Sequence, residues 1–187
     1  MNKNFVFLIV LSTLLIISAC QSTEKNISNV QEKDLEIAII GEIPDITEEN
    51  IKFTGIDFKE LENESFYYDA VFIMENYLGE ATQINNIKRF KNSSKPIFFI
   101  GSKASYFPFI ESENPLPYQE YVERLNISNY EVSGIIYVDD ITGYRSFNIS
   151  SPVEEVDLSS SMKKKVFSEV FNAIRKNKLH KEDSISN

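Results

Sequence analysis

The fold class follows from the stretch Lys95-Pro96-Ile97-Phe98-Phe99-Ile100, in which four apolar residues stand together after a proline. A short run of β-branched and aromatic residues that does not alternate with polar ones is typical of a strand covered on both faces. Three more runs have this character: Ile37-Ala38-Ile39-Ile40, Ala70-Val71-Phe72-Ile73-Met74 and Ile135-Ile136-Tyr137-Val138. Strands of this kind predict a mostly parallel sheet. Phe53 to Phe58 alternates weakly and is a candidate edge strand.

Helical patterns occupy the segments between these runs. The first has Ala81, Ile84, Ile87 and Phe90 at a spacing of three, and the second has Tyr118, Tyr121, Val122 and Leu125 after Pro117. The last and clearest has Met162, Val166, Phe167, Val170, Phe171 and Ile174, with N-cap serines at 159–161. Alternation of strands and helices predicts an α/β three-layer sandwich with a mostly parallel sheet of four to six strands.

Two parts of this sandwich depart from the regular pattern. About 28 residues separate the first two apolar runs and must also hold the edge strand, so we expect one flank to be irregular. After Val138, a turn through Gly143 leads into Tyr144 to Ile149, which predicts a hairpin and an antiparallel edge strand. The chain after Asn177 is polar, so we expect a frayed tail.

Composition excludes several classes of function. The chain has 187 residues and a net charge of −9, a balance that repels phosphate backbones and makes nucleic acid an unsuitable partner. It has one cysteine, Cys20, and one histidine, His180, which lies in the polar tail. A Cys–His or Ser–His–Asp arrangement would require that tail to fold back into a pocket.

The N-terminus has the features of an export signal. Phe5 to Ile17 is almost entirely apolar, and thirteen helical residues span about 20 Å, which is too short for a bilayer core. The small residues Ser18-Ala19 follow, directly before Cys20. Ile17-Ser18-Ala19-Cys20 resembles the lipobox of bacterial lipoproteins, although Ile17 stands where that family usually has Leu. The resemblance implies that the cysteine carries diacylglycerol and acyl chains such as palmitate.

This resemblance predicts the organisation of the whole chain. Residues 1–19 are expected to be a signal peptide, 20–34 a lipidated flexible tether, 35–178 one α/β domain and 179–187 a polar tail. Acyl chains hold a protein at a membrane because each buried methylene contributes about 0.8 kcal/mol. We therefore expect an extracytoplasmic protein of the cell envelope, anchored to the membrane through Cys20.

The domain itself resembles flavodoxin-like and receiver-like α/β domains. Tyr68 to Met74 is similar to their third strand, and Lys95 to Ile100 is similar to their fourth. Receiver domains use an acidic pair and a phosphoacceptor aspartate, whereas the matching positions here hold Gly41-Glu42 and Glu75-Asn76. The resemblance therefore concerns the fold and selects no activity.

Acidic residues follow several of the predicted strands, at Glu42, Glu75, Asp139 and Asp140. In open α/β sheets, ligands lie beyond the carboxyl ends of the parallel strands, so these carboxylates are candidate ligands for Mg²⁺ or Ca²⁺. Gly101-Ser102-Lys103 could hold an anion at the same rim. The alternative is that these residues are solvated loop positions.

The segment from Ala104 to Pro117 is a candidate binding loop. It holds Tyr106, Phe107 and Phe109 where a crossover helix is expected to begin. The alternative is that its rings fill the core beneath an irregular loop.

Three hypotheses for function stay open. The first is a non-catalytic binding or accessory module that recognises a protein or another envelope component. The second is a divalent-metal-assisted enzyme in which Lys103 acts as an electrophile beside the carboxylates. The third is a small-ligand binder for uptake.

Overall fold

The computed structural model describes residues 34–46, 48–63, 67–110, 113–125, 131–137, 143–150 and 160–185. The chain divides into two compact units, Met1–Glu32 and Lys33–Asn187, and every described residue belongs to the second. The predicted signal peptide, Cys20 and the tether as far as residue 33 lie outside the described residues. So do the predicted turn residues Asp139 and Asp140.

One sheet of six strands organises the domain, in the spatial order β2-β1-β3-β4-β5-β6. The strands are β1 (Leu35–Ile40), β2 (Ile51–Gly55), β3 (Ala70–Ile73), β4 (Ile97–Ser102), β5 (Glu131–Tyr137) and β6 (Tyr144–Ser150). The first four are parallel, with pairings such as Ile37 to Phe53, Ile37 to Ala70 and Phe72 to Phe98. The predicted α/β sandwich with a mostly parallel sheet and an antiparallel edge is therefore confirmed.

The sequence predicted an edge strand near Phe53 and an antiparallel edge strand after Gly143, and the structure has both. β2 is an edge strand, although it begins at Ile51 rather than Phe53 and ends at Gly55. At the other edge, β6 pairs with β5 in an antiparallel hairpin, from Tyr137 opposite Tyr144 to Glu131 opposite Ser150. Gly143 precedes β6 with φ +76°, the left-handed conformation that favours glycine in a turn.

The direction of β5 corrects the sequence prediction. The run Ile135 to Val138 was expected to be parallel, but β5 is antiparallel to β4, with Ser102 opposite Glu131. An apolar run reports burial on two faces and carries no information about strand direction. The chain leaves β4 and enters β5 at the same end of the strands, where Ser102 pairs with Glu131, and β5 therefore runs in the opposite direction.

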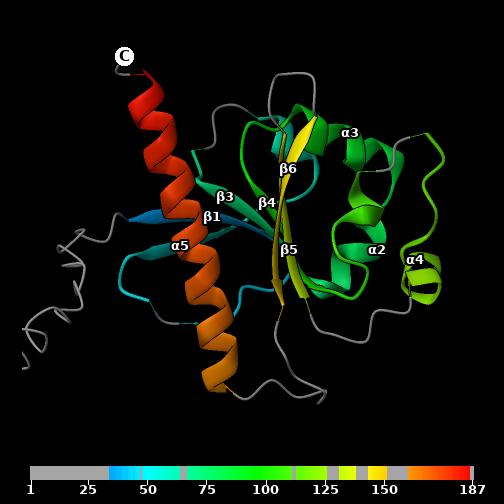
Figure 1. Ribbon diagram of the computed structural model, residues 1–187, viewed down its shortest axis with the longest axis horizontal. Helices are drawn as coiled ribbons and strands as arrows, with labels where there is room; N and C mark the ends of the chain where they lie inside the picture. Colours follow the sequence, from blue (N-terminus) through cyan, green and yellow to red (C-terminus); the bar gives the residue numbers. More distant parts are fainter. Residues whose placement is uncertain are drawn as a thin grey trace, which may run out of the picture. The chain divides into compact units, whose positions relative to one another are not determined.

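Short helices and one long helix cover the two faces of the sheet (Figure 1). They are η2 (Lys59–Glu62), η3 (Glu75–Tyr77), α2 (Leu78–Ala81), α3 (Ile84–Asn92), η4 (Phe107–Phe109), α4 (Tyr118–Leu125) and α5 (Ser160–Ile185). Figure 1 shows α5 on one side of the sheet and α2, α3 and α4 on the other. The connection from β1 to β2 has no helix in its described part, as the shortness of this crossover predicted.

The first core lies between the sheet and the short helices. Ile40, Val71 and Phe99 point into it from the strands, and Leu78 and Phe90 close it from α2 and α3. Phe90 meets Phe99 edge to face, with ring centroids 5.6 Å apart.

The second core lies between the sheet and α5. Phe72 is at its centre and is stacked on Phe171 of α5 at 6.2 Å, while Phe167 lies at 5.9 Å. Val170 and Ile174 complete the buried stripe of α5. The predicted apolar stripe of this helix is thus confirmed over its described side chains.

Three helices differ from their predicted form. The pattern at Ala81, Ile84, Ile87 and Phe90 is divided into α2 and α3, and Ile84 lies exposed at the start of α3. Thr82 causes part of this break, because its hydroxyl donates to the Gly79 carbonyl at 2.9 Å and competes with the helix ladder.

α4 begins after Pro117 as predicted, but none of its residues is fully buried. α5 continues to Ile185, beyond the point at which the tail was expected to fray. Among the described residues, the structure has no helix that is both long and apolar enough to span a bilayer.

Candidate ligand site at the carboxyl edge of the sheet

The strand order creates a switch point between β1 and β3. The connection after β1 passes over the α5 face, where Ile46 packs against the second core. The connection after β3 passes over the opposite face, where α2 and α3 begin. Adjacent parallel strands whose connections part in this way leave a crevice at their carboxyl ends, which is the usual ligand position in open α/β sheets.

A pocket of about 570 Å³ lies beside this switch point, at the ends of β1 and β2. Its lining runs from Ile39 to Gly41, from Gly55 to Glu60, and includes Tyr77 and Glu80. The volume is in the range of sites for small molecules. A second hollow of about 480 Å³ lies between β6 and α5, away from the ends of the parallel strands.

Gly41 shapes the floor of the pocket. Its φ is +121°, and a Cβ at this position would lie 2.8 Å from Met74 Cβ and 3.0 Å from Tyr77 Cδ2. Glycine is therefore required both by the backbone conformation and by the close approach of Tyr77. The absence of a side chain lets Tyr77 lie against the end of β1.

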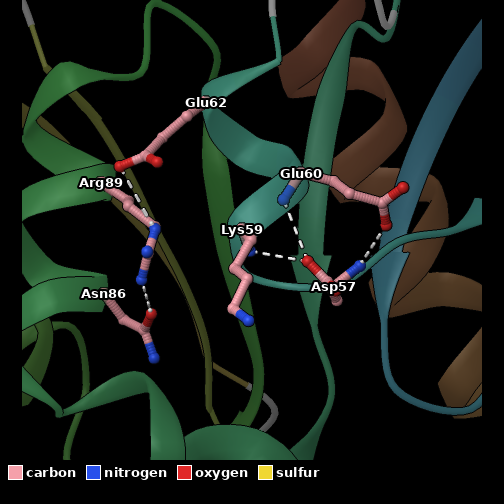
Figure 2. A network of polar contacts seen from close by, with 6 residues as sticks. All are labelled: Asp57, Lys59, Glu60, Glu62, Asn86 and Arg89. Atoms are coloured by element: carbon pink, nitrogen blue, oxygen red, sulfur yellow. Dashed lines mark hydrogen bonds and ion pairs between the residues drawn. The ribbon is translucent and has the colours of Figure 1, made fainter.

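Reciprocal hydrogen bonds fix the wall that contains Asp57 and Glu60 (Figure 2). Asp57 Oδ1 accepts from the backbone N–H of Lys59 at 2.7 Å and of Glu60 at 3.0 Å, and Glu60 Oε2 accepts from Asp57 N–H at 2.7 Å. This is the pattern of a capping box, applied to the start of η2. One oxygen of each carboxylate is used in this way, and the wall becomes rigid.

Arg89 ties the same wall to α3 (Figure 2). Its Nη1 donates to Asn86 Oδ1 at 2.8 Å, and its Nε lies 3.3 Å from Glu62 Oε1. The Nε is buried, and its contact with Glu62 lacks hydrogen-bond geometry, so the attraction is mainly electrostatic. η2 is therefore held both by its own backbone caps and by an ion pair to a neighbouring helix.

The predicted metal ligands are not assembled by the described part of the chain. Glu42 is exposed after β1, and Glu75 pairs with Lys103, with Nζ 3.6 Å from Oε1. Because β5 is reversed, its carboxyl end is directed to the edge opposite the ends of β1, β3 and β4. Within the described ranges, no three His, Cys, Asp or Glu side chains are grouped to hold a metal ion. A role for Asp139 and Asp140 with Mg²⁺ or Ca²⁺ stays a prediction.

The turn after β4 serves to connect elements. The Lys103 N–H donates to the Tyr118 hydroxyl at 2.7 Å, which joins the turn to α4. Burial raises the pKa of Tyr118, although the nearby Ser102 hydroxyl and the Lys103 N–H act in the opposite direction. The predicted anion site at Gly101-Ser102-Lys103 therefore has a backbone donor that is already bonded within the chain.

Three buried serines hold this turn in place: Ser102 at the end of β4, Ser105 in the turn itself and Ser133 in β5. Ser102 donates to the Ser105 carbonyl at 2.7 Å, and Ser105 donates to Asn148 Oδ1 at 3.0 Å. Ser133 Oγ lies 3.1 Å from the same Asn148 oxygen. Ser105 has φ +54°, which is rare for a residue with a side chain. These bonds fasten a strained turn to β5 and β6 and leave the serines closed to solvent.

The aromatic loop separates into a core part and a surface part. Phe109 is 0% exposed and stacks on Phe99 with centroids 3.7 Å apart, so it fills the first core. Phe107 is 45% exposed and stacks on Tyr106 at 4.8 Å, and Tyr106 lies 5.7 Å from Tyr144 of β6. Two of the three predicted binding residues therefore form a small aromatic surface, and the third is structural.

The pocket residues were not predicted from the sequence. Asp57 lies in the loop after β2, and the other polar residues of the lining belong to short helices; they are Lys59, Glu60, Tyr77 and Glu80. The usable signals were the Asp57-x-x-Glu60 spacing, which predicts a cap, and glycines at positions 41 and 55 near strand ends. Neither signal predicts a pocket without the strand order.

Comparison with known proteins gives no match for this chain among protein-family models, curated proteins or solved structures.

Proposed function

We propose that this protein is a lipid-anchored extracytoplasmic binding module, in which Cys20 carries the anchor and the switch-point pocket receives a small ligand. The pocket at the carboxyl ends of β1 and β2 is the observation that carries the proposal. The residues that line it include carboxylates, one lysine and one tyrosine, but no cysteine, histidine or serine. This set favours binding over nucleophilic catalysis.

The anchor is supported by the order of features around Cys20. An apolar segment of signal-peptide length leads to small residues and then to the only cysteine of the chain. The exposed Phe107 ring, stacked on the half-buried Tyr106, is a second contact region, suited to a protein or other component of the envelope. The proposal includes neither nucleic acid nor a metal cofactor.

Metabolic labelling with an alkyne palmitate tests the anchor. Labelled protein is expected in the membrane fraction of a host that processes lipoproteins, and Cys20→Ala is expected to remove the label. A Cys20→Ala variant that keeps its label would overturn the lipidation proposal.

Chemical-shift mapping tests the pocket separately from the anchor. Both cores lie within the unit Lys33–Asn187, so we expect residues 21–187 to fold without the leader. With ¹⁵N-labelled protein and mixtures of small metabolites, the perturbed amides are expected to cluster at Gly41, Gly55, Ile56 and Tyr77. Shifts confined to other regions, or no shifts at all, would remove the pocket from the proposed function.

A further inference from the structure

We infer that the switch-point pocket is selective for small organic amines, an inference that rests on the proposed binding function and specifies its ligand class. Three carboxylates line the pocket, from Asp57, Glu60 and Glu80, against one ammonium, from Lys59. The described residues of the lining therefore carry a formal charge of −2. A cavity with this balance attracts a cation and rejects phosphates and carboxylates.

The carboxylates are available to a ligand. Asp57 and Glu60 each use one oxygen in the caps of η2, which leaves Asp57 Oδ2 and Glu60 Oε1 without a hydrogen bond in the described part of the chain. None of the three carboxylates forms an ion pair with another described residue. Figure 2 shows the Lys59 side chain directed away from the carboxylates of Asp57 and Glu60. An incoming ammonium would therefore find acceptors that no internal cation occupies.

Tyr77 adds a second attraction for a cation. Its side chain is 40% exposed at the pocket, and the missing Cβ of Gly41 lets it lie close to the floor. A ring in this position can receive an ammonium group over its face or pack against the methylenes between two amines. Carboxylate acceptors together with the exposed ring of Tyr77 suit an amine better than a neutral sugar or an anion.

Three probes with the same four-carbon chain test the inference: putrescine, 1,4-butanediol and succinate. Binding to residues 21–187 is measured by calorimetry and by ¹⁵N chemical shifts in 150 mM salt, which screens non-specific attraction to this acidic protein. We expect saturable binding of putrescine, with shifts at Gly41, Gly55 and Tyr77. Butanediol and succinate are expected to bind at least tenfold more weakly.

Matched variants separate the pocket from the general charge of the protein. Glu80 and Glu123 are both exposed, but only Glu80 lines the pocket, so Glu80→Gln tests the pocket and Glu123→Gln makes the same change on α4 outside it. Putrescine affinity should fall about tenfold in Glu80→Gln and stay within twofold in Glu123→Gln. Tyr77→Leu should also weaken binding, with the fold checked by circular dichroism.

The possible results are distinguishable. Equal losses in the two glutamine variants, or no putrescine binding at 10 mM, would overturn the amine inference. Preferential binding of butanediol or succinate at Gly41 and Gly55 would overturn it as well, but would keep the pocket as the ligand site. Failure of palmitate labelling concerns the anchor alone.

Discussion

Among single residues, Gly41 has little freedom to change, because both its φ of +121° and the neighbouring Met74 and Tyr77 exclude a side chain. We expect Gly41→Ala to lower the free energy of unfolding by about 2 to 3 kcal/mol, from backbone strain and the displaced contacts. Gly79→Ala is the control, since its Cβ would meet nothing within 4 Å in α2, and it should stabilise by about 0.5 kcal/mol. Urea unfolding measures both changes, and equal effects would contradict this account of Gly41.

Tyr67 and Tyr68 are adjacent residues with opposite environments. Tyr68 is 7% exposed, and burial raises its pKa above the usual 10.0, whereas Tyr67 is 65% exposed. A raised pKa means that the folded state holds the phenol proton more tightly, so stability is present below pH 10 and is lost as the pH rises above it. Tyr68→Phe should therefore flatten the decline in stability above pH 10.

Tyr67→Phe is the control for this pH dependence, because the exposed ring keeps its place over Lys95 without the hydroxyl. Melting temperatures across the alkaline range measure the difference between the two variants. If the melting temperatures of both variants fall with pH as steeply as that of the parent protein, Tyr68 is not the cause of the alkaline loss of stability.

At the scale of elements, η2 depends on side chains because a helix of four residues has little stability of its own. Asp57→Ala removes the acceptor for two backbone N–H groups and should cost about 1 kcal/mol. Asp57→Asn keeps an acceptor oxygen and should cost less than half as much. Amide hydrogen exchange at Lys59 and Glu60 should quicken in the first variant only; unchanged exchange there would show that Arg89 alone holds the wall.

The long helix α5 contributes mainly through its aromatic stripe. Phe171 is 2% exposed and contacts Phe53, Phe72 and Phe167. Phe171→Ala should lower the free energy of unfolding by about 3 to 5 kcal/mol, because it leaves a cavity that the strands opposite cannot move to fill. Its neighbour Asn172 is exposed, so Asn172→Ala should change stability by less than about 0.5 kcal/mol, as measured by urea unfolding. Similar losses in both would argue against this packing.

The same elements show how far the sequence could be used for prediction. The runs of β1, β3 and β4 were recognisable because burial on two faces leaves only apolar residues, and the stripe of α5 because its period is close to 3.6. Phe107 and Phe109 are both phenylalanines in the same loop, and nothing in the local sequence says which one is buried. Only the fold shows that Phe107 lies on the surface and Phe109 in the core. The pocket depends on strand order, which is a long-range property that no local pattern records.

At the scale of the whole molecule, the two cores differ in how they are covered. Several short helices share the first core, whereas α5 alone supplies the helix of the second. A chain that ends at residue 159 should lose the second core and expose the ring of Phe72, with strong binding of the dye ANS. A chain that ends at Asn177 keeps the whole described stripe to Ile174 and should bind no more dye than the parent. Equal dye binding by the two truncated chains would show that α5 is dispensable.

The position of α5 has a consequence for the timing of folding. Its stripe follows all six strands along the chain, so the residues that close the second core leave the ribosome after the whole sheet has been synthesised. Until α5 has been synthesised, the face of the sheet that it covers would remain exposed, and the nascent chain could not reach its final stability. The order of elements along this chain thus leaves the second core open until after the whole sheet has been synthesised.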